Sequence, residues 1–153
     1  ESREVRPTTA VTRLTAAETT LAPWRELAGV GAEVSGVGEY RARVVLAEVP
    51  EGRGLLDLGS TSGGLGSVSV NGSEPIGFDT IHPVVDVTDL VTAGENELVV
   101  RVASSLNNRL LARGYYDSVP DVLGMIAGVE AMQNTYVRDY GLVGPLRLLT
   151  VAI

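Results

Sequence analysis

Two stretches of the chain alternate apolar and polar residues with a period of two, and this alternation constrains the fold more than any other feature. The first stretch runs from Val85 to Thr88, and the second runs from Glu97 to Ala103. Successive side chains of a strand point to opposite faces, so this pattern is typical of strands with one buried face. Between the two stretches, Thr88 or Asp89 is expected to cap a single helical turn, and Gly94 is expected to supply a left-handed residue where the chain reverses.

Further segments of the same kind are spread over the chain, with glycine and proline between them. Strands are expected at 10–15, 40–49, 55–59, 67–70 and 146–153. The side chains expected on the buried face of 40–49 are those of Tyr40, Ala42, Val44 and Leu46. Many short strands without a long helical pattern among them predict an all-β fold, an antiparallel β-sandwich.

The Asn71-Gly72 pair follows one of these segments and predicts a hairpin turn. Together with Ser73 it also forms a glycosylation sequon. We prefer the turn as the reason for this pair, because Asn-Gly is the strongest short-range hairpin signal.

Length and composition exclude several classes of protein. The 153 residues fit one domain, expected at 10–153 behind a charged tail or linker at 1–9. The absence of cysteine excludes disulfides and thiolate metal sites. A net charge of −7, with scattered arginines and no lysine, argues against nucleic acid as a partner. No apolar run approaches the ~20 residues of a membrane span, so no membrane partner is expected. Because the chain starts at Glu1 without methionine, we interpret it as a piece cut from a larger enzyme.

Four motifs occur in a fixed order: Ser35–Arg41 (SGVGEYR), Leu56–Gly59 (LDLG), Ser67–Gly72 (SVSVNG) and Asp86–Ser105 (DVTDLVTAGENELVVRVASS). In this order they resemble the sugar-binding β-sandwich domain of β-galactosidase- and β-glucuronidase-type glycoside hydrolases. The pairing of LNNRL at 106–110 with YGLVGPLRL at 140–148 is most similar to the C-terminal domain of bacterial α-L-rhamnosidases. The resemblance implies a jelly-roll of the galactose-binding-domain type. It also implies that the catalytic acid and base belong to a separate domain.

The segment 113–136 departs from this family pattern and interrupts the succession of strands. Apolar residues at spacings of three and four predict a short helical or loop insertion, in which two glycines would weaken a helix; these apolar residues are Val119, Val122, Leu123, Ile126 and Val129. Four of the five tyrosines lie in or beside this insertion, so it is a candidate recognition surface. The alternative is an elaborated loop that covers one end of the sandwich.

The sequence holds no recognisable catalytic machinery. His82 is the only histidine, and neither a cysteine nor a G-x-S-x-G motif accompanies it. No pair among the 19 acidic residues stands out as the two carboxylates of a glycosidase. We therefore expect no enzyme activity from this domain by itself, and no cofactor or transition metal. A structural calcium, which such β-sandwich modules often carry, stays open as an alternative; its candidate ligands are Asp86, Thr88 and Asp89, or Asp117 and Asp121.

Carbohydrate recognition is expected from stacking and hydrogen-bonding side chains, namely Trp24, Tyr40, His82, Arg109, Tyr115 and Tyr116. Trp24, the only tryptophan, has an alternative role as a plug at one end of the core. The Asn107-Asn108-Arg109 run, expected at the end of the longest strand, has the alternative task of hydrogen-bonding loop carbonyls and fixing that corner.

These features favour a non-catalytic carbohydrate-binding accessory domain of a larger, secreted and hence extracellular glycoside hydrolase with an α-L-rhamnosidase-like or β-galactosidase-like parent. Its expected partners are a carbohydrate and the catalytic domain of the same parent chain. The alternative is a structural module that packs against the catalytic domain and holds no sugar itself. Tyrosine rings that line a concavity would favour the first function, and a flat apolar patch would favour the second.

Overall fold

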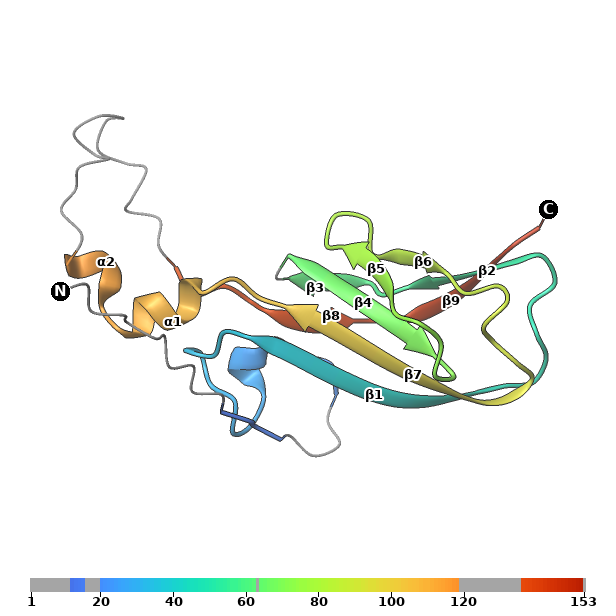
Figure 1. Cartoon of the computed structure of the whole chain (residues 1–153), viewed down its shortest axis with the longest axis horizontal. Helices are drawn as coiled ribbons and strands as arrows, with labels where there is room; N and C mark the ends of the chain where they lie inside the picture. The colour runs from blue at the N-terminus through green and yellow to red at the C-terminus, as the bar shows by residue number, and fades with distance from the viewer. Residues whose placement is uncertain (1–11, 16–19, 63, 119–135, 153) are drawn as a thin grey trace, which may run out of the picture.

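The computed structural model describes residues 12–15, 20–62, 64–118 and 136–152, which form two facing antiparallel sheets (Figure 1). The first sheet has the order β1-β7-β4-β5, with β1 at Val37–Leu46, β7 at Gly94–Ala103, β4 at Leu65–Val70 and β5 at Ile76–Asp79. The second has the order β6-β2-β9, with β6 at Val84–Asp86, β2 at Arg53–Asp57 and β9 at Arg147–Val151. A two-stranded ladder of β3 (Ser60–Ser62) and β8 (Gly141–Gly144) lies next to β2 and β9 in sequence. The predicted antiparallel β-sandwich is confirmed.

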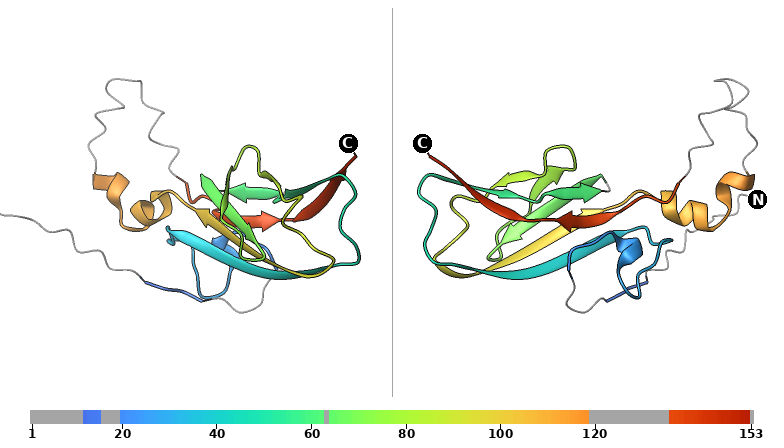
Figure 2. Two further views of the ribbon diagram at one scale, coloured as in Figure 1. Left: turned by 45° about the vertical axis from the view of Figure 1, so that its right-hand side comes forward. Right: turned by 180° about the vertical axis from the view of Figure 1, so that it is seen from behind.

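The core consists of side chains from both sheets, whose backbones face each other in the two views of Figure 2. The core follows from the same period-two pattern that predicted the strands. Along β7, every second residue is buried, namely Asn96, Leu98, Val100 and Val102. The first sheet contributes to the core with Val68, Val70, Phe78, Leu98, Val100 and Val102, and the second sheet and its neighbouring loops contribute with Leu56, Leu58, Val85, Val87, Val91 and Leu142.

Strand β1 has the predicted inward face but lacks the predicted burial. Tyr40 and Leu46 pack against the core, whereas Val44 is 39% exposed. The cause is the position of β1 at the edge of a four-stranded sheet, opposite a described sheet of three strands that ends at β9. The result is an open apolar depression, the β1 groove, of about 1380 Å³ between β1 and β9.

The outward face of β1 and β7 carries charged side chains in cross-strand contact. Glu39 lies opposite Arg101 in the register and accepts a hydrogen bond of 2.9 Å from its Nε. Arg41 approaches the same carboxylate at 2.9 Å from its Nη2. The hydrogen bonds from Arg101 and then Arg41 lower the pKa of Glu39. The side chains of Arg43 and Glu95 extend this charged ladder, with 3.7 Å between Nη1 and Oε1.

Helical elements gather at the end of the sandwich where β1 begins and β7 finishes (Figure 1). They are η1 at Trp24–Glu26, α1 at Asn107–Ala112 and α2 at Tyr115–Ser118. The prediction that Asn107 ends a strand is therefore wrong, because β7 finishes at Ala103 and the chain turns into α1. The remainder of the predicted insertion, 119–135, lies outside the described residues.

Two further local predictions differ from the structure. No strand includes Thr12–Thr15, which is the described part of the segment 10–15. In the turn after β6, Asp86 is the capping side chain in place of Thr88 or Asp89: its Oδ1 accepts from the backbone N–H of Thr88 at 3.0 Å. The left-handed residue predicted at Gly94 is confirmed by its φ of 91°.

At the opposite end of the sandwich, the Asn71-Gly72 turn is confirmed. Asn71 and Gly72 have φ angles of 52° and 76°, and Ser73 donates a hydrogen bond to the carbonyl of Val70. The Asn71 amide donates to the carbonyl of Leu90 at 2.9 Å and to Oδ1 of the buried Asn96 at 2.8 Å. The side chain of Asn71 therefore ties two turns together, which supports the structural reason for this residue.

Candidate functional site

A polar cleft opens at the helical end of the sandwich. We call it the end cleft; it has a volume of about 580 Å³. Its walls come from five separate segments of the chain, and they include Ser62, Thr80, Asn107, Tyr116, Arg138 and Tyr140. Hydroxyl, amide and guanidinium groups of this kind are the donors and acceptors that proteins use to fix a polar ligand.

Helix α1 forms one wall and positions the chain that forms the next wall. The side chain of Asn107 donates to the carbonyl of Tyr136 at 3.0 Å. Asn108, which is 3% exposed, donates to the carbonyl of Arg138 at 2.9 Å and accepts from the N–H of Arg138 at 2.8 Å. The alternative role predicted for these asparagines, hydrogen bonds to loop carbonyls, is thus what they do in the structure.

Aromatic and hydroxyl side chains complete the cleft. Tyr116 is half-buried, and its hydroxyl donates to Oδ1 of Asn107 at 3.4 Å. In the same wall, the hydroxyl groups of the exposed Ser105 and the buried Tyr140 form a hydrogen bond with each other. Thr61 also lines the cleft, and its Oγ1 is the one buried side-chain oxygen or nitrogen of the described residues without a hydrogen-bond partner. The cleft therefore has two aromatic rings among its polar groups, the half-buried Tyr116 and the buried Tyr140.

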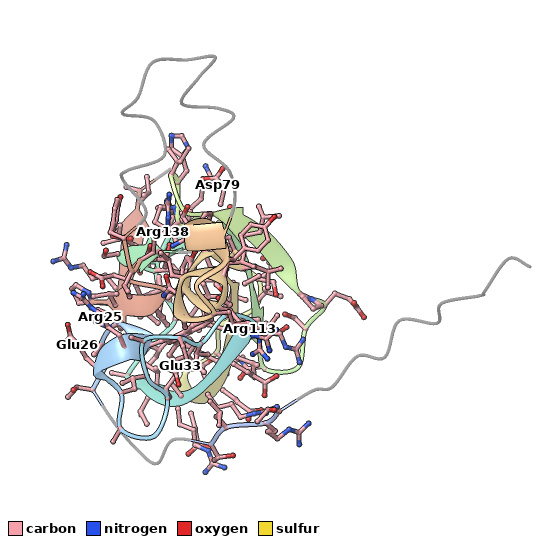
Figure 3. The ribbon with its side chains drawn as sticks, turned by 90° about the vertical axis from the view of Figure 1, so that its left-hand side faces the viewer. Arg25, Glu26, Glu33, Asp79, Arg113 and Arg138 are labelled. Carbon is pink, nitrogen blue, oxygen red and sulfur yellow. The ribbon has the colours of Figure 1, made fainter. Side chains whose placement is uncertain are left out.

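Arg138 is the only charged side chain that lines the end cleft among the described residues. Its guanidinium carbon lies 5.6 Å from the centre of the Tyr136 ring, within the range of a cation–π interaction. Figure 3 looks at this end of the molecule and shows Arg138 well separated from Arg113. The described lining of the cleft thus carries one positive charge and no negative charge, in a chain whose net charge is −7.

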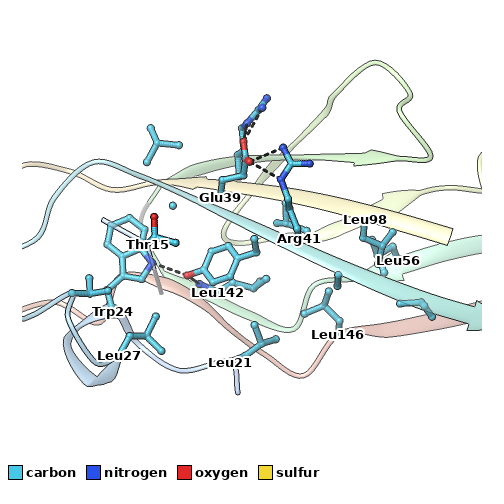
Figure 4. Close-up of a pocket in the computed structure, with 18 of the residues that line it drawn as sticks. Thr15, Leu21, Trp24, Leu27, Glu39, Arg41, Leu56, Leu98, Leu142 and Leu146 are labelled. Atoms are coloured by element: carbon cyan, nitrogen blue, oxygen red, sulfur yellow. Dashed lines mark hydrogen bonds and ion pairs between the residues drawn. The ribbon is translucent and has the colours of Figure 1, made fainter. Parts of the chain in front are cut away.

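The structure buries Trp24, one of the predicted sugar-binding residues, and half-buries a second, Tyr40, which lines the β1 groove. Trp24 is 6% exposed, and its Nε1 donates to the Tyr40 hydroxyl at 2.6 Å. The ring fits against Gly38 and Gly141: a Cβ atom at either glycine would lie 2.6 Å from the indole. A sugar ring cannot stack on a face that protein covers, so the stacking role predicted for Trp24 is wrong and its alternative role as a core plug is correct. Figure 4 shows Trp24 at one end of the β1 groove, beside Leu27.

The other predicted residues do not form one site with the end cleft. His82 belongs to the turn before β6, where its side chain is 84% exposed. The N–H groups of His82 and Ile81 donate to the carboxylate of Asp79 and lower its pKa. Arg109 is exposed on α1, and Tyr115 is 51% exposed with its ring edge against Tyr116. Of the six predicted residues, only Tyr116 lines the end cleft.

The pattern around Arg138 was not recognised in the sequence. Arg138 lies in the segment Tyr136-Val137-Arg138-Asp139-Tyr140, directly before β8. Two tyrosines around an arginine form a local signal for a binding surface, since both residue types are enriched where proteins recognise ligands and partners. The other polar groups of the cleft come from β3, the turn after β5, α1 and α2, and no spacing in the sequence connects them.

The described residues contain no group of three or more histidine, aspartate or glutamate side chains placed to hold a metal ion. Of the calcium ligands considered above, Asp86 uses Oδ2 to accept a hydrogen bond from Arg53 at 2.7 Å. A guanidinium in this position repels a divalent cation, so the Asp86 group does not fit a calcium site. The side chains of Asp117 and Asp121 lie outside the described part of the chain.

Within the described ranges, no helix has the length and apolar character needed to cross a membrane.

Nine chains of solved structures are similar to this chain, two of which follow, whereas no protein-family model and no curated protein matches the sequence. The first is a rhamnosidase from Novosphingobium sp. PP1Y, with 27% identity and a TM-score of 0.62 over 84% of this chain and 12% of that chain. The second is an FMN-binding β-glucuronidase from Faecalibacterium prausnitzii L2-6, with 21% identity and a TM-score of 0.45 over 61% of this chain and 15% of that chain. The chain therefore spans only a small part of either enzyme. The similarity to the rhamnosidase confirms the predicted resemblance to a β-sandwich domain of glycoside hydrolases.

Proposed function

We propose that this chain is a non-catalytic carbohydrate-binding domain of a larger secreted glycoside hydrolase, and that the end cleft holds the sugar. The observation that carries the proposal is the combination of the Tyr116 ring with hydroxyl and amide groups in one concave site. An aromatic face suits the C–H groups of a pyranose, and paired donors and acceptors suit its hydroxyls. A tyrosine that lines a concavity is the arrangement expected for sugar recognition.

The similarity to the rhamnosidase supports the same proposal. This chain matches 12% of that enzyme, so a domain of this kind occurs beside other parts of a much longer chain. In the proposed parent enzyme, the end cleft would hold one part of a glycan while a separate domain carries out the chemistry.

Titration calorimetry of the 153-residue chain with a panel of plant and bacterial oligosaccharides tests the proposal. We expect saturable heats with at least one glycan. The variant Tyr116→Ala should lose most of the affinity for that glycan, because it removes the aromatic face. His82→Ala is the control, since it removes an exposed ring that does not line the end cleft. Flat titrations over the whole panel would overturn the proposal, as would equal losses in the two variants.

A structural module is the second candidate function, and the β1 groove favours it. Half of the inward face of β1 lacks cover from the described residues, and Leu146 and Leu148 of the other sheet line the same groove. Burial of apolar surface stabilises an interface by ~25 cal/mol per Å². The occupant of this groove would be the catalytic domain of the same parent chain.

Hydrogen exchange distinguishes the two functions in a parent enzyme that contains this domain. The amides of β1 should be more protected in the parent than in the isolated chain if the groove is an interface between domains. Protection of β1 that is equal in the two proteins would exclude this second function. Because the groove and the end cleft are separate, sugar binding at the cleft would be unaffected by either result.

A further inference from the structure

We infer that the end cleft selects anionic sugars, in which a carboxylate such as that of a uronic acid pairs with Arg138. The inference rests on the proposed function and names the class of carbohydrate. It starts from the charge of the lining: Arg138 contributes a full positive charge, and no aspartate or glutamate of the described residues lines the cleft. A neutral sugar would offer no negative charge to this guanidinium.

Among the described arginines, five form no ion pair with a described carboxylate, namely Arg13, Arg109, Arg113, Arg138 and Arg147, and Arg138 is the one of these that lines the end cleft. Arg25, Arg41, Arg53 and Arg101 each have a carboxylate oxygen within 2.9 Å. Arg138 forms no ion pair with a carboxylate of the described residues, although acidic residues outnumber basic residues by 19 to 12 in the chain. The neighbouring carboxylate, that of Asp139, lies 2.6 Å from Nε of Arg25 instead. Within the described ranges, the guanidinium of Arg138 therefore has no carboxylate partner, and it lines a cleft where the carboxylate of a ligand could reach it.

The backbone around Arg138 is fixed while its side chain is free to bind. Asn108 holds both the N–H and the carbonyl of Arg138, and the Tyr136 ring lies beside the guanidinium. A guanidinium is a planar fork that matches the two oxygens of a carboxylate, and such charge-assisted pairs are roughly twice as strong as neutral hydrogen bonds. Tyr116, Ser62 and Thr80 remain for the ring face and the hydroxyls of the same sugar.

Two pairs of sugars that differ only at the sixth carbon test this inference. The 153-residue chain is titrated at pH 7 and low salt with D-galacturonic acid against D-galactose, and with D-glucuronic acid against D-glucose. We expect at least one acid to bind about tenfold more tightly than its neutral counterpart, as a charge-assisted pair implies. The preference should decrease at high salt, because screening weakens attraction between exposed charges.

Substitutions test whether the preference for acidic sugars comes from the side chain of Arg138. Arg138→Gln should abolish the preference, and Arg138→Lys should retain part of it because the charge stays while the fork is lost. Arg113→Gln is the matched control: it makes the same change of charge at the same end of the molecule, outside the cleft lining. The thermal midpoints of all variants are measured, so that a folding defect is not mistaken for a loss of binding.

The outcomes separate the inference from the proposed function. If neutral and acidic sugars bind equally, the selectivity for anions is overturned and the carbohydrate-binding function stands. If Arg113→Gln abolishes the preference as Arg138→Gln does, the preference comes from the overall charge and the role of Arg138 is overturned. If no sugar of the wider panel binds, both are overturned.

Discussion

The buried side chain of Asn108 makes two hydrogen bonds to the backbone of Arg138, one to its carbonyl at 2.9 Å and one from its N–H at 2.8 Å. The two residues are 30 positions apart in the sequence, and the interaction joins helix α1 to the segment that enters β8. A carboxamide that satisfies both groups of one residue copies the hydrogen bonds of a neighbouring strand. The wall of the end cleft therefore has its position set from within the protein.

Asn108→Ala should lower the free energy of unfolding by about 2 kcal/mol, because it leaves the N–H and the carbonyl of Arg138 without partners. Urea denaturation measures this change. The same variant should weaken sugar binding at the end cleft, since Arg138 is no longer held in place. Asn96→Ala is the control at the opposite end: it should lower stability and leave sugar affinity unchanged. Equal affinities of Asn108→Ala and the wild type would exclude a positioning role for Asn108.

Asn96 itself should be among the most sensitive positions of the fold. It is 2% exposed, accepts from Asn71 and the N–H of Thr92, and donates to the carbonyls of Thr92 and Gly94. Asn96→Leu removes these partners and buries several unsatisfied groups, so we expect a loss of roughly 3 kcal/mol or more in unfolding free energy. A melting temperature within one or two degrees of the wild type would show that water satisfies these groups instead.

Asp86 should make the protein lose stability as the pH falls through the acid range. Its pKa is lowered from 3.8 to about 2, first by the hydrogen bond from the Thr88 hydroxyl and then by that from Arg53. Between these two pH values the unfolded chain binds a proton at this position and the folded protein does not, so acid favours unfolding. The stabilisation is therefore complete above about pH 4 and is lost as the pH approaches about 2.

Asp86→Asn should flatten the dependence of unfolding free energy on pH over that window, measured by urea titrations at intervals from pH 5 to about pH 2. The control is Asp89→Asn, which removes a carboxylate that makes no hydrogen bond or ion pair with a described residue. A slope that stays the same in Asp86→Asn, or that changes equally in both variants, would contradict the role of Asp86.

Gly38→Ala tests the placement of Trp24. The added Cβ would lie 2.6 Å from the indole Cζ2, so the ring has to move, and overpacking of this kind costs about 1–3 kcal/mol. Trp24 is the only tryptophan, so a red shift of the fluorescence emission would report its movement toward water. Gly77→Ala is the control, because there the nearest atom is 4.0 Å from the new Cβ. Unchanged emission and stability in Gly38→Ala would contradict the packing described here.

The sheets could be predicted from the sequence because their signals are local. In β7 the alternation of side chains and the burial that it predicts concern the same few residues, and the Asn71-Gly72 turn needs only positive φ at two adjacent positions. The extent of burial was harder to predict: Val44 is on the correct face of β1 but exposed, because burial depends on what lies opposite in the other sheet.

The site was predicted poorly for a related reason. Trp24 has an aromatic ring of the kind that stacks on sugars, but the sequence does not show whether that ring is exposed. Its burial depends on Gly38 and Gly141, which are distant from it in sequence and leave space for the indole. Likewise, Asn107 was expected in a strand, and it starts α1 instead because tertiary hydrogen bonds to the segment near Tyr136 outweigh its weak helix propensity. Arg138 becomes a candidate only after the fold has brought five segments together.

Strand β1 leaves one row of backbone hydrogen-bonding groups without a neighbour in the described sheet, and such a row is a template on which copies of a protein can polymerise. The charged ladder of Glu39, Arg41 and Arg43 along that strand opposes this, because an approaching strand has to bring matching charges into register. This protection is electrostatic and is screened over about 10 Å at 0.1 M salt. We therefore expect association of the chain through the β1 edge to increase as the salt concentration rises.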